Sequence, residues 1–254
     1  MEQSDPAPAV ARHGHAAATV AALALACWAF LAWTAVDMGN PVALLMMPMS
    51  ADWTVPNTLA IFAMWAIMMA AMMLPSAWPM VRTFAEVSSR NREMTRMRAF
   101  VGAYLIVWIG FSIAAAVAQW AFQLADWVNP MIVSTSAPLT ATMLVIAGVY
   151  QFSPLKQMCL SRCRTPVGFL LGEWRPGVRG AWVMGLRHGL FCVGCCWALM
   201  ALLFVGGAMN LAWVGALSIV VAIEKLAPKG DRVALALGAV LIAAGVGKLA
   251  ALLI

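Results

Sequence analysis

Charged residues are scarce in this sequence, and their scarcity excludes most soluble folds. Only 10% of the 254 residues are Asp, Glu, Lys or Arg, whereas 64% are hydrophobic. A soluble domain carries about 25% charged residues and about 45–50% apolar ones. A chain this apolar has lipid as its main solvent, so we expect a polytopic membrane protein.

Several signatures of soluble enzymes and pumps are also missing. The sequence has no nucleotide-binding loop, no zinc-protease signature and no Ser-His-Asp set with plausible chemistry. It also lacks the inverted repeat found in many transporters. Any transport would therefore be passive, gradient-coupled or driven by ligand exchange with a carrier, and we predict no catalytic residues.

The net charge of +6 indicates membrane topology rather than nucleic-acid binding. Lys and Arg gather in the connections 81–98, 153–179 and 224–232, whereas 37–56 and 126–136 contain none. Basic connections mark the cytoplasmic side of a membrane. The alternation predicts an inner-membrane protein with its N-terminus inside and its C-terminus outside.

The apolar segments predict an all-α transmembrane helix bundle of about seven spans. Residues 1–14 are expected to form a disordered cytoplasmic tail, and residues 15–254 a single transmembrane helical domain. The fourth and sixth spans are short, and the Gly206-Gly207 link before the sixth also suits a re-entrant hairpin. The predicted spans are residues 15–36, 57–80, 99–125, 137–152, 180–205, 209–223 and 233–253.

Methionine is as frequent as glycine, with 19 of each. In the second predicted span, Met64, Met68 and Met72 recur every four residues and so share one helix face. Met69 and Met73 form an adjacent row. Adaptable packing is the ordinary explanation of such rows, and the alternative is that thioether sulfurs are collected as ligands for a soft metal.

The fifth predicted span carries a second face of chemically reactive groups. His188, Cys192, Cys196 and Met200 also recur every four residues, and Cys195 lies beside this row. Ionisable groups inside a membrane are costly and by default functional. The alternatives are buried, inert cysteines and a His188 whose ring reaches the membrane surface. Topology puts this face at the same depth as the methionine face, although contact between the two is only an inference.

Soft thiolate and thioether ligands select Cu(I), whereas zinc favours Cys or His sites and hard ions need oxygen. The six cysteines do not form a disulfide framework, because most lie in apolar segments and the rest in a basic loop. In that loop, Cys159 and Cys163 are secondary metal or redox candidates, since nearby arginines favour thiolate. The predicted Cu(I) ligands are Met64, Met68, Met72, His188, Cys192, Cys195, Cys196 and Met200. A further outer thioether group is predicted at Met46, Met47 and Met49.

Four blocks of sequence carry a family resemblance. They are MWAIMMAAMMLPS, SPLKQMCLSRCR, GLRHGLFCVGCCWALMALLFVGGAMNLAW and EKLAP, which fall between Met64 and Pro228. Together they resemble an uncharacterised bacterial family of predicted metal-binding integral membrane proteins. The resemblance implies a multi-span inner-membrane protein with a metal site, and it implies no substrate.

Three classes of function remain open. The first is a copper-handling membrane protein that transports Cu(I) or delivers it to a metallochaperone, cuproenzyme or other membrane subunit. The second is a thiol-redox membrane oxidoreductase that uses Cys192, Cys195 and Cys196. The third is a structural or assembly subunit of a larger membrane complex. Two further polar features have simpler interpretations: Glu224 and Lys225 suggest an interfacial pair, and Arg187 has no assigned role.

Overall fold

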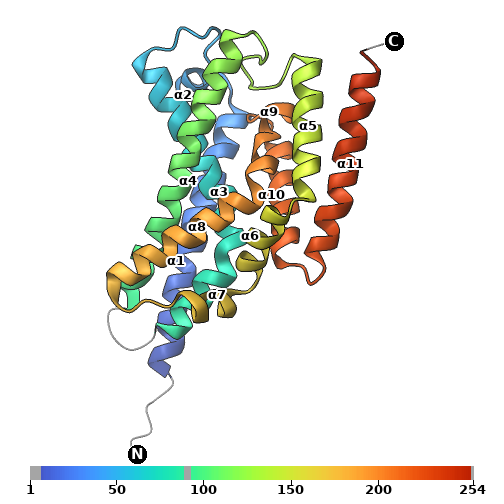
Figure 1. The fold of residues 1–254 in the computed structure, drawn as a ribbon. Helices are drawn as coiled ribbons and strands as arrows, with labels where there is room; N and C mark the ends of the chain where they lie inside the picture. Colours follow the sequence, from blue (N-terminus) through green and yellow to red (C-terminus); the bar gives the residue numbers. More distant parts are fainter. Residues whose placement is uncertain (1–6, 89–92, 253–254) are drawn as a thin grey trace, which may run out of the picture.

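The computed structural model describes residues 7–88 and 93–252, which form a bundle of α-helices (Figure 1). Within these residues the only β-type pairing is an isolated bridge between Val128 and Ser134, so the predicted all-α class is confirmed. The helices are α1 (Ala7–Val36), α2 (Pro41–Met46), α3 (Val55–Val87), α4 (Glu93–Leu124), α5 (Ala137–Gln151), α6 (Pro154–Arg164), α7 (Pro166–Glu173), α8 (Gly177–Ala201), α9 (Leu203–Gly206), α10 (Leu211–Leu226) and α11 (Gly230–Ala250).

Five helical segments are long and apolar enough to cross a membrane, and they coincide with five of the seven predicted spans. They are Ala18–Val36, Val55–Val87, Met94–Leu124, Gly177–Gly206 and Gly230–Ala250. A sixth is obtained if α5 and α6, which meet at a bend of 64°, count together as one span. The other predicted span corresponds to α10, which has only 16 residues.

The N-terminal tail prediction falls only partly on the described residues. Residues 1–6 lie outside them, and α1 begins at Ala7, within the segment expected to be a tail. In Figure 1, α1 and α11 finish at the same end of the bundle, opposite to the end where α1 begins.

The basic segment predicted as a loop at 153–179 instead folds into α6 and α7. The Ser153 side chain caps α6 by accepting a hydrogen bond from the Lys156 backbone at 3.1 Å, and Pro154 suits the first helical turn. α6 then packs on α8, where a Cβ added at Gly194 would lie 2.7 Å from the Cys159 sulfur. The segment therefore becomes part of the bundle and carries Cys159 and Cys163 to α8.

Proline shapes the middle of α3. Pro75 has no N–H, so the carbonyl of Ala71 loses its helical partner. The indole of Trp28 in α1 donates to this carbonyl at 2.9 Å and so replaces the missing helical partner. The hydroxyl of Tyr104 in α4 likewise donates to the Met73 carbonyl at 3.2 Å. Both bonds tie neighbouring helices to the segment that holds the methionine rows.

Glycine allows α8 to approach α4 closely as it crosses the bundle obliquely (Figure 1). A Cβ at Gly185 would overlap the carbonyl oxygen of Phe100, and one at Gly189 would lie 2.9 Å from Val107. Small residues let membrane helices approach in this way. The close contact fixes the height and rotation of α8, and with them the directions of its cysteines.

The interfacial pair predicted from Glu224 and Lys225 is wrong, because both side chains are buried and turn to different partners. Glu224 forms an ion pair with Lys156 of α6 at 2.7 Å, and each side chain is 1% exposed. Gln151 of α5 donates to the other carboxylate oxygen at 3.2 Å. Successive helical residues point about 100° apart. Lys225 therefore faces α3 and α8 instead.

This geometry predicts that Glu224→Gln strongly destabilises the protein. The substitution leaves the Lys156 ammonium buried without a counter-charge, which costs about 3–5 kcal/mol in buried pairs. Thermal unfolding of the detergent-solubilised protein measures the effect. The matched control is Asp231→Asn, which breaks the ion pair between Asp231 and Arg164. The Asp231 side chain is 64% exposed, so its loss should cost little stability. Equal unfolding temperatures for the two variants contradict the prediction.

Candidate metal centre

The three cysteines of α8 point toward two different neighbours. Consecutive residues of a helix are rotated about 100° from each other, so Cys195 and Cys196 diverge. The Cys196 sulfur lies 3.9 Å from the Met73 sulfur of α3, and the Cys195 sulfur lies 4.0 Å from the Cys163 sulfur of α6. Each thiol also donates to the backbone carbonyl of Cys192, at 3.1 Å from Cys195 and 2.9 Å from Cys196. The result is two sulfur pairs joined at one turn of α8.

Cys192 sits at the polar centre of the cluster. Its sulfur lies 3.0 Å from the Lys225 ammonium of α10 and 3.1 Å from the Tyr104 hydroxyl of α4. Lys225 also contacts the Ser76 hydroxyl at 3.1 Å and the Met73 sulfur at 3.8 Å. These five side chains are all buried. A positive charge thus lies among sulfur atoms where the bundle excludes water.

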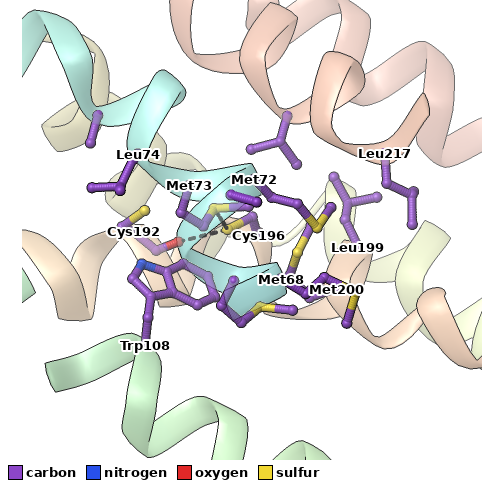
Figure 2. Packing of buried hydrophobic residues seen from close by; sticks show 14 of the residues in the cluster. Met68, Met72, Met73, Leu74, Trp108, Cys192, Cys196, Leu199, Met200 and Leu217 are labelled. Carbon is purple, nitrogen blue, oxygen red and sulfur yellow. Dashed lines mark hydrogen bonds between the residues drawn. The ribbon is translucent and has the colours of Figure 1, made fainter. Parts of the chain in front are cut away.

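The methionine-bearing helix α3 and the cysteine-bearing helix α8 come into sulfur contact through Met73 and Cys196. Figure 2 shows Met68, Met72, Met73, Cys192, Cys196 and Met200 gathered between α3 and α8, all members of one buried cluster. Met64 belongs to the same cluster one turn away on α3. The methionine in sulfur contact with a cysteine, however, is Met73 of the adjacent row, which was not among the predicted ligands.

His188 lies apart from the sulfur pairs. Its ring packs among those of Phe100, Tyr104 and Phe169, with centroids 5.5 to 5.9 Å away. Its Nδ1 atom is buried, and within the described part of the chain it has no hydrogen-bond partner. The side chain is therefore positioned by aromatic packing one turn before Cys192, and its ring nitrogen remains available to a ligand.

Two further residues singled out in the sequence have clear positions. Arg187, which had no assigned role, forms an ion pair with Glu173 at the end of α7, where 45% of the arginine side chain is exposed. Cys159 packs against the backbone of α8 at Gly194. Of the secondary pair, only Cys163 contacts a sulfur of α8.

The outer thioether group predicted at residues 46–49 is split between two environments. Met46 is buried in the core, whereas Met49 is 88% exposed. The two side chains therefore do not share one site.

The sulfur spacing fits a soft, low-coordinate metal ion. Within the described residues, no group of three or more His, Cys, Asp and Glu side chains is arranged to hold a metal. With a metal–sulfur bond of about 2.3 Å, two sulfurs on one ion lie about 3.8 Å apart in tetrahedral geometry and about 4.6 Å apart in linear geometry. The observed separations of 3.9 and 4.0 Å fall within this range.

Periodicity in the sequence could not find every member of the cluster. Tyr104, Ser76 and Lys225 come from three different helices and have no spacing relation to the cysteines. Met73 did carry a signal, since it belongs to the second methionine row. The choice between the two rows depends on the rotation of α3, which local sequence does not specify.

Residues 62–247 match the family PpoB2, whose description is copper chaperone. No curated protein and no solved structure matches the chain. The matched segment includes α8 and both sulfur pairs. The match agrees with the metal-binding character implied by the sequence resemblance, but the family's description names a copper chaperone and not a membrane protein of unknown function.

The contact between Cys163 and Cys195 predicts efficient cross-linking of these two thiols. A variant that keeps only these cysteines, with serine at the other four positions, should be bridged by a short bifunctional thiol reagent such as dibromobimane. Fluorescence of the bridged product measures the reaction. The matched control keeps Cys27 and Cys195, and total thiol accessibility is measured in both variants with a maleimide. Comparable bridging in the two variants argues against the observed packing of α6 on α8.

Proposed function

The chain belongs to the copper chaperone family PpoB2, and from this premise we propose that it is a membrane protein that binds Cu(I) and delivers it to a partner. The observation that carries the proposal is the buried pair of sulfurs at Cys196 and Met73, 3.9 Å apart. Copper is also the metal that the thiol and thioether composition of the site predicts. The family description and the ligand chemistry therefore agree on the same element.

Charge favours a monovalent ion at this site. A single thiolate neutralises Cu(I), whereas a divalent ion bound by one thiolate and one thioether keeps a net positive charge. Such a charge is costly in a buried site without water. The nearby ammonium of Lys225 adds to this cost for a divalent ion. Ligand softness and electrostatics thus select the same oxidation state.

The second sulfur pair suits release of the ion. Cys195 is buried, whereas Cys163 in α6 is partly exposed. Because Cys195 and Cys196 are adjacent on α8, an ion held by Cys196 can pass to the Cys163–Cys195 pair by exchanging one sulfur ligand at a time. A metallochaperone or cuproenzyme with its own thiols or thioethers would complete the exchange. Transfer of this kind requires no ATP-binding domain, in keeping with the motifs absent from the sequence.

A thiol-redox function is the second candidate, favoured by the 4.0 Å separation of Cys163 and Cys195. Its partly exposed member, Cys163, is the more accessible of the two to a partner thiol. The two proposals differ in one measurable respect, because copper binding needs reduced thiols and a redox cycle produces a disulfide. A Cys163–Cys195 disulfide in native membranes, together with no Cu(I) binding by the reduced protein, favours the redox function.

We further propose seven spans in an inner membrane, with α10 as the short sixth span and the N-terminus inside. Basic and neutral connections alternate along the chain. The C-terminal ends of α1 and α11 lie at the same end of the bundle, as an odd number of spans requires (Figure 1).

A topology prediction follows for reporter fusions. Alkaline phosphatase, which folds only outside the cytoplasm, should be active when fused in the 37–56 connection and inactive when fused in the 153–179 segment. Fusion to the C-terminus should again give activity. Activity at all three positions, or at the middle one alone, contradicts the proposed orientation.

The copper proposal predicts that Met73→Leu and Cys196→Ser weaken Cu(I) binding by about tenfold or more. Even changes around a metal's direct ligands cost about 10–100-fold in affinity. Leucine keeps the volume of methionine and removes its sulfur, so the fold should persist. The measurement is an anaerobic titration of purified protein with Cu(I) against a coloured competing chelator.

The chain offers a control for each of these two substitutions. Met80→Leu tests an equally buried methionine of α3, and Cys27→Ser tests a cysteine of α1 that lies outside the predicted site. Both controls should bind Cu(I) as the unmodified protein does. The proposal fails if the unmodified protein does not bind Cu(I), or if Met73→Leu and Met80→Leu have the same affinity.

A further inference from the structure

We infer that the protein has a second site for a soft monovalent cation, formed by Met38, Met131 and Met209 at the opposite end of the bundle from α6 and α7. The three residues line one cavity of about 360 Å³. They come from the connections after α1, after α4 and after α9, so the fold brings together thioethers that are far apart in the sequence. The inference rests on the proposed copper function and adds a place where the ion first binds.

The methionine sulfurs are the side-chain atoms in the cavity wall that are free to bind a cation. Among the described residues that form the wall, no side chain is charged, and the only amide is that of Asn210. This amide is already engaged, because its oxygen accepts from the Trp213 backbone at 3.2 Å and its nitrogen donates to the Gly206 carbonyl at 3.3 Å. A hard cation finds no carboxylate here, whereas Cu(I) or Ag(I) finds three thioethers.

The loop that carries Met131 is held in a strained conformation. The next residue, Ile132, has φ of +61° and is fully buried, although a β-branched residue rarely adopts positive φ. Surrounding bonds impose this conformation: the Val133 backbone donates to the Asn129 side chain at 2.9 Å, and the Ser134 backbone donates to the Phe204 carbonyl at 2.8 Å. Such strain is concentrated at functional positions, where the fold holds a group in place.

The opposite side of the cavity is equally constrained. Gly207 has φ of +92°, a conformation that side chains disfavour. A Cβ at this position would lie 2.7 Å from the Val133 side chain and 3.3 Å from the Met131 carbonyl. Glycine therefore lets the connection before α10 close against the 131–133 loop. This contact brings Met209 and Met131 to the same cavity.

The exposed fraction of the side chain decreases across the three methionines. Met131 is 39% exposed, Met38 is half-buried and Met209 is 5% exposed. Thioethers bind Cu(I) without losing a proton, so a site made of them works on the oxidising side of a membrane, where free thiols are at risk. The gradation suits entry of an ion from water into the bundle.

The methionine row of α3 offers further thioethers on the same helix that carries Met73. Met64, Met68 and Met72 repeat at about 6 Å along the helix, given a rise of about 1.5 Å per residue. α3 packs against both α1 and α10, which carry walls of the cavity. The same helix ends its row beside Met73 and Cys196. An ion that enters the bundle thus finds further thioethers on the helix that reaches the deeper sulfur pairs.

The test compares how many Ag(I) ions each of three variants binds. Ag(I) is a redox-inert probe of soft sites, and calorimetric titration of the purified full-length protein gives both stoichiometry and affinity. The triple variant Met38→Leu/Met131→Leu/Met209→Leu should lose about one equivalent of bound Ag(I), or weaken it by about tenfold or more. The single variant Met131→Leu changes a partly exposed side chain, so folding is not at risk, and it should weaken the same binding step. The control Met49→Leu alters a highly exposed methionine outside the cavity and should change nothing.

A fourth variant, Met73→Leu/Cys196→Ser, separates this inference from the proposed function. It should lose the binding step that belongs to the Met73–Cys196 pair and retain the one that the triple variant loses. If the triple variant binds Ag(I) as the unmodified protein does, the cavity is not a metal site, while the copper proposal stands. If the fourth variant also binds as the unmodified protein does, the copper proposal itself is wrong. An equal effect of Met49→Leu and Met131→Leu also overturns the inference.

Discussion

The ion pair between Lys156 and Glu224 is the interaction on which the sulfur cluster depends. Neither charge can reach water, so each must stay with the other, and the pair locks α6 against α10. The same α6 carries Cys163 to Cys195, and the residue after Glu224 is Lys225, which reaches Cys192. One buried pair thus sets the positions of two groups that no local pattern connects.

Exclusion of water also explains what the cluster can bind. In a low-dielectric interior a site tolerates little net charge, so one thiolate with a thioether matches one monovalent ion. Lys225 sharpens this selection because its ammonium disfavours extra positive charge nearby. The proposed entry cavity also offers soft sulfur ligands, but all of them are thioethers and none is a thiol. We therefore propose a division of labour in which thioethers collect the ion and thiols hold it.

Much of the architecture and part of the site were predictable. Low charge content and apolar segments indicated the helical bundle, and five of the seven spans coincide with long apolar helices. The four-residue spacing indicated a methionine face on α3 and a cysteine face on α8, which do share one buried cluster. By contrast, the segment at 153–179 was expected to be a loop. Its capping residues favour helices, but its many Lys and Arg residues suggested a solvent-exposed loop.

The sequence by itself determined the apolar character of the helices, their periodicity and the softness of the available ligands, because these follow from residue type and local spacing. Tertiary structure alone decided that Met73 rather than Met64 reaches a cysteine, that Cys163 faces Cys195, and that Lys225 turns inward. Each of these depends on how far one helix is rotated against another. That rotation is set by contacts between residues far apart in the sequence, such as the fit of Gly185 against Phe100 and the pairing of Lys156 with Glu224. The spacing of residues along the sequence does not reveal such contacts.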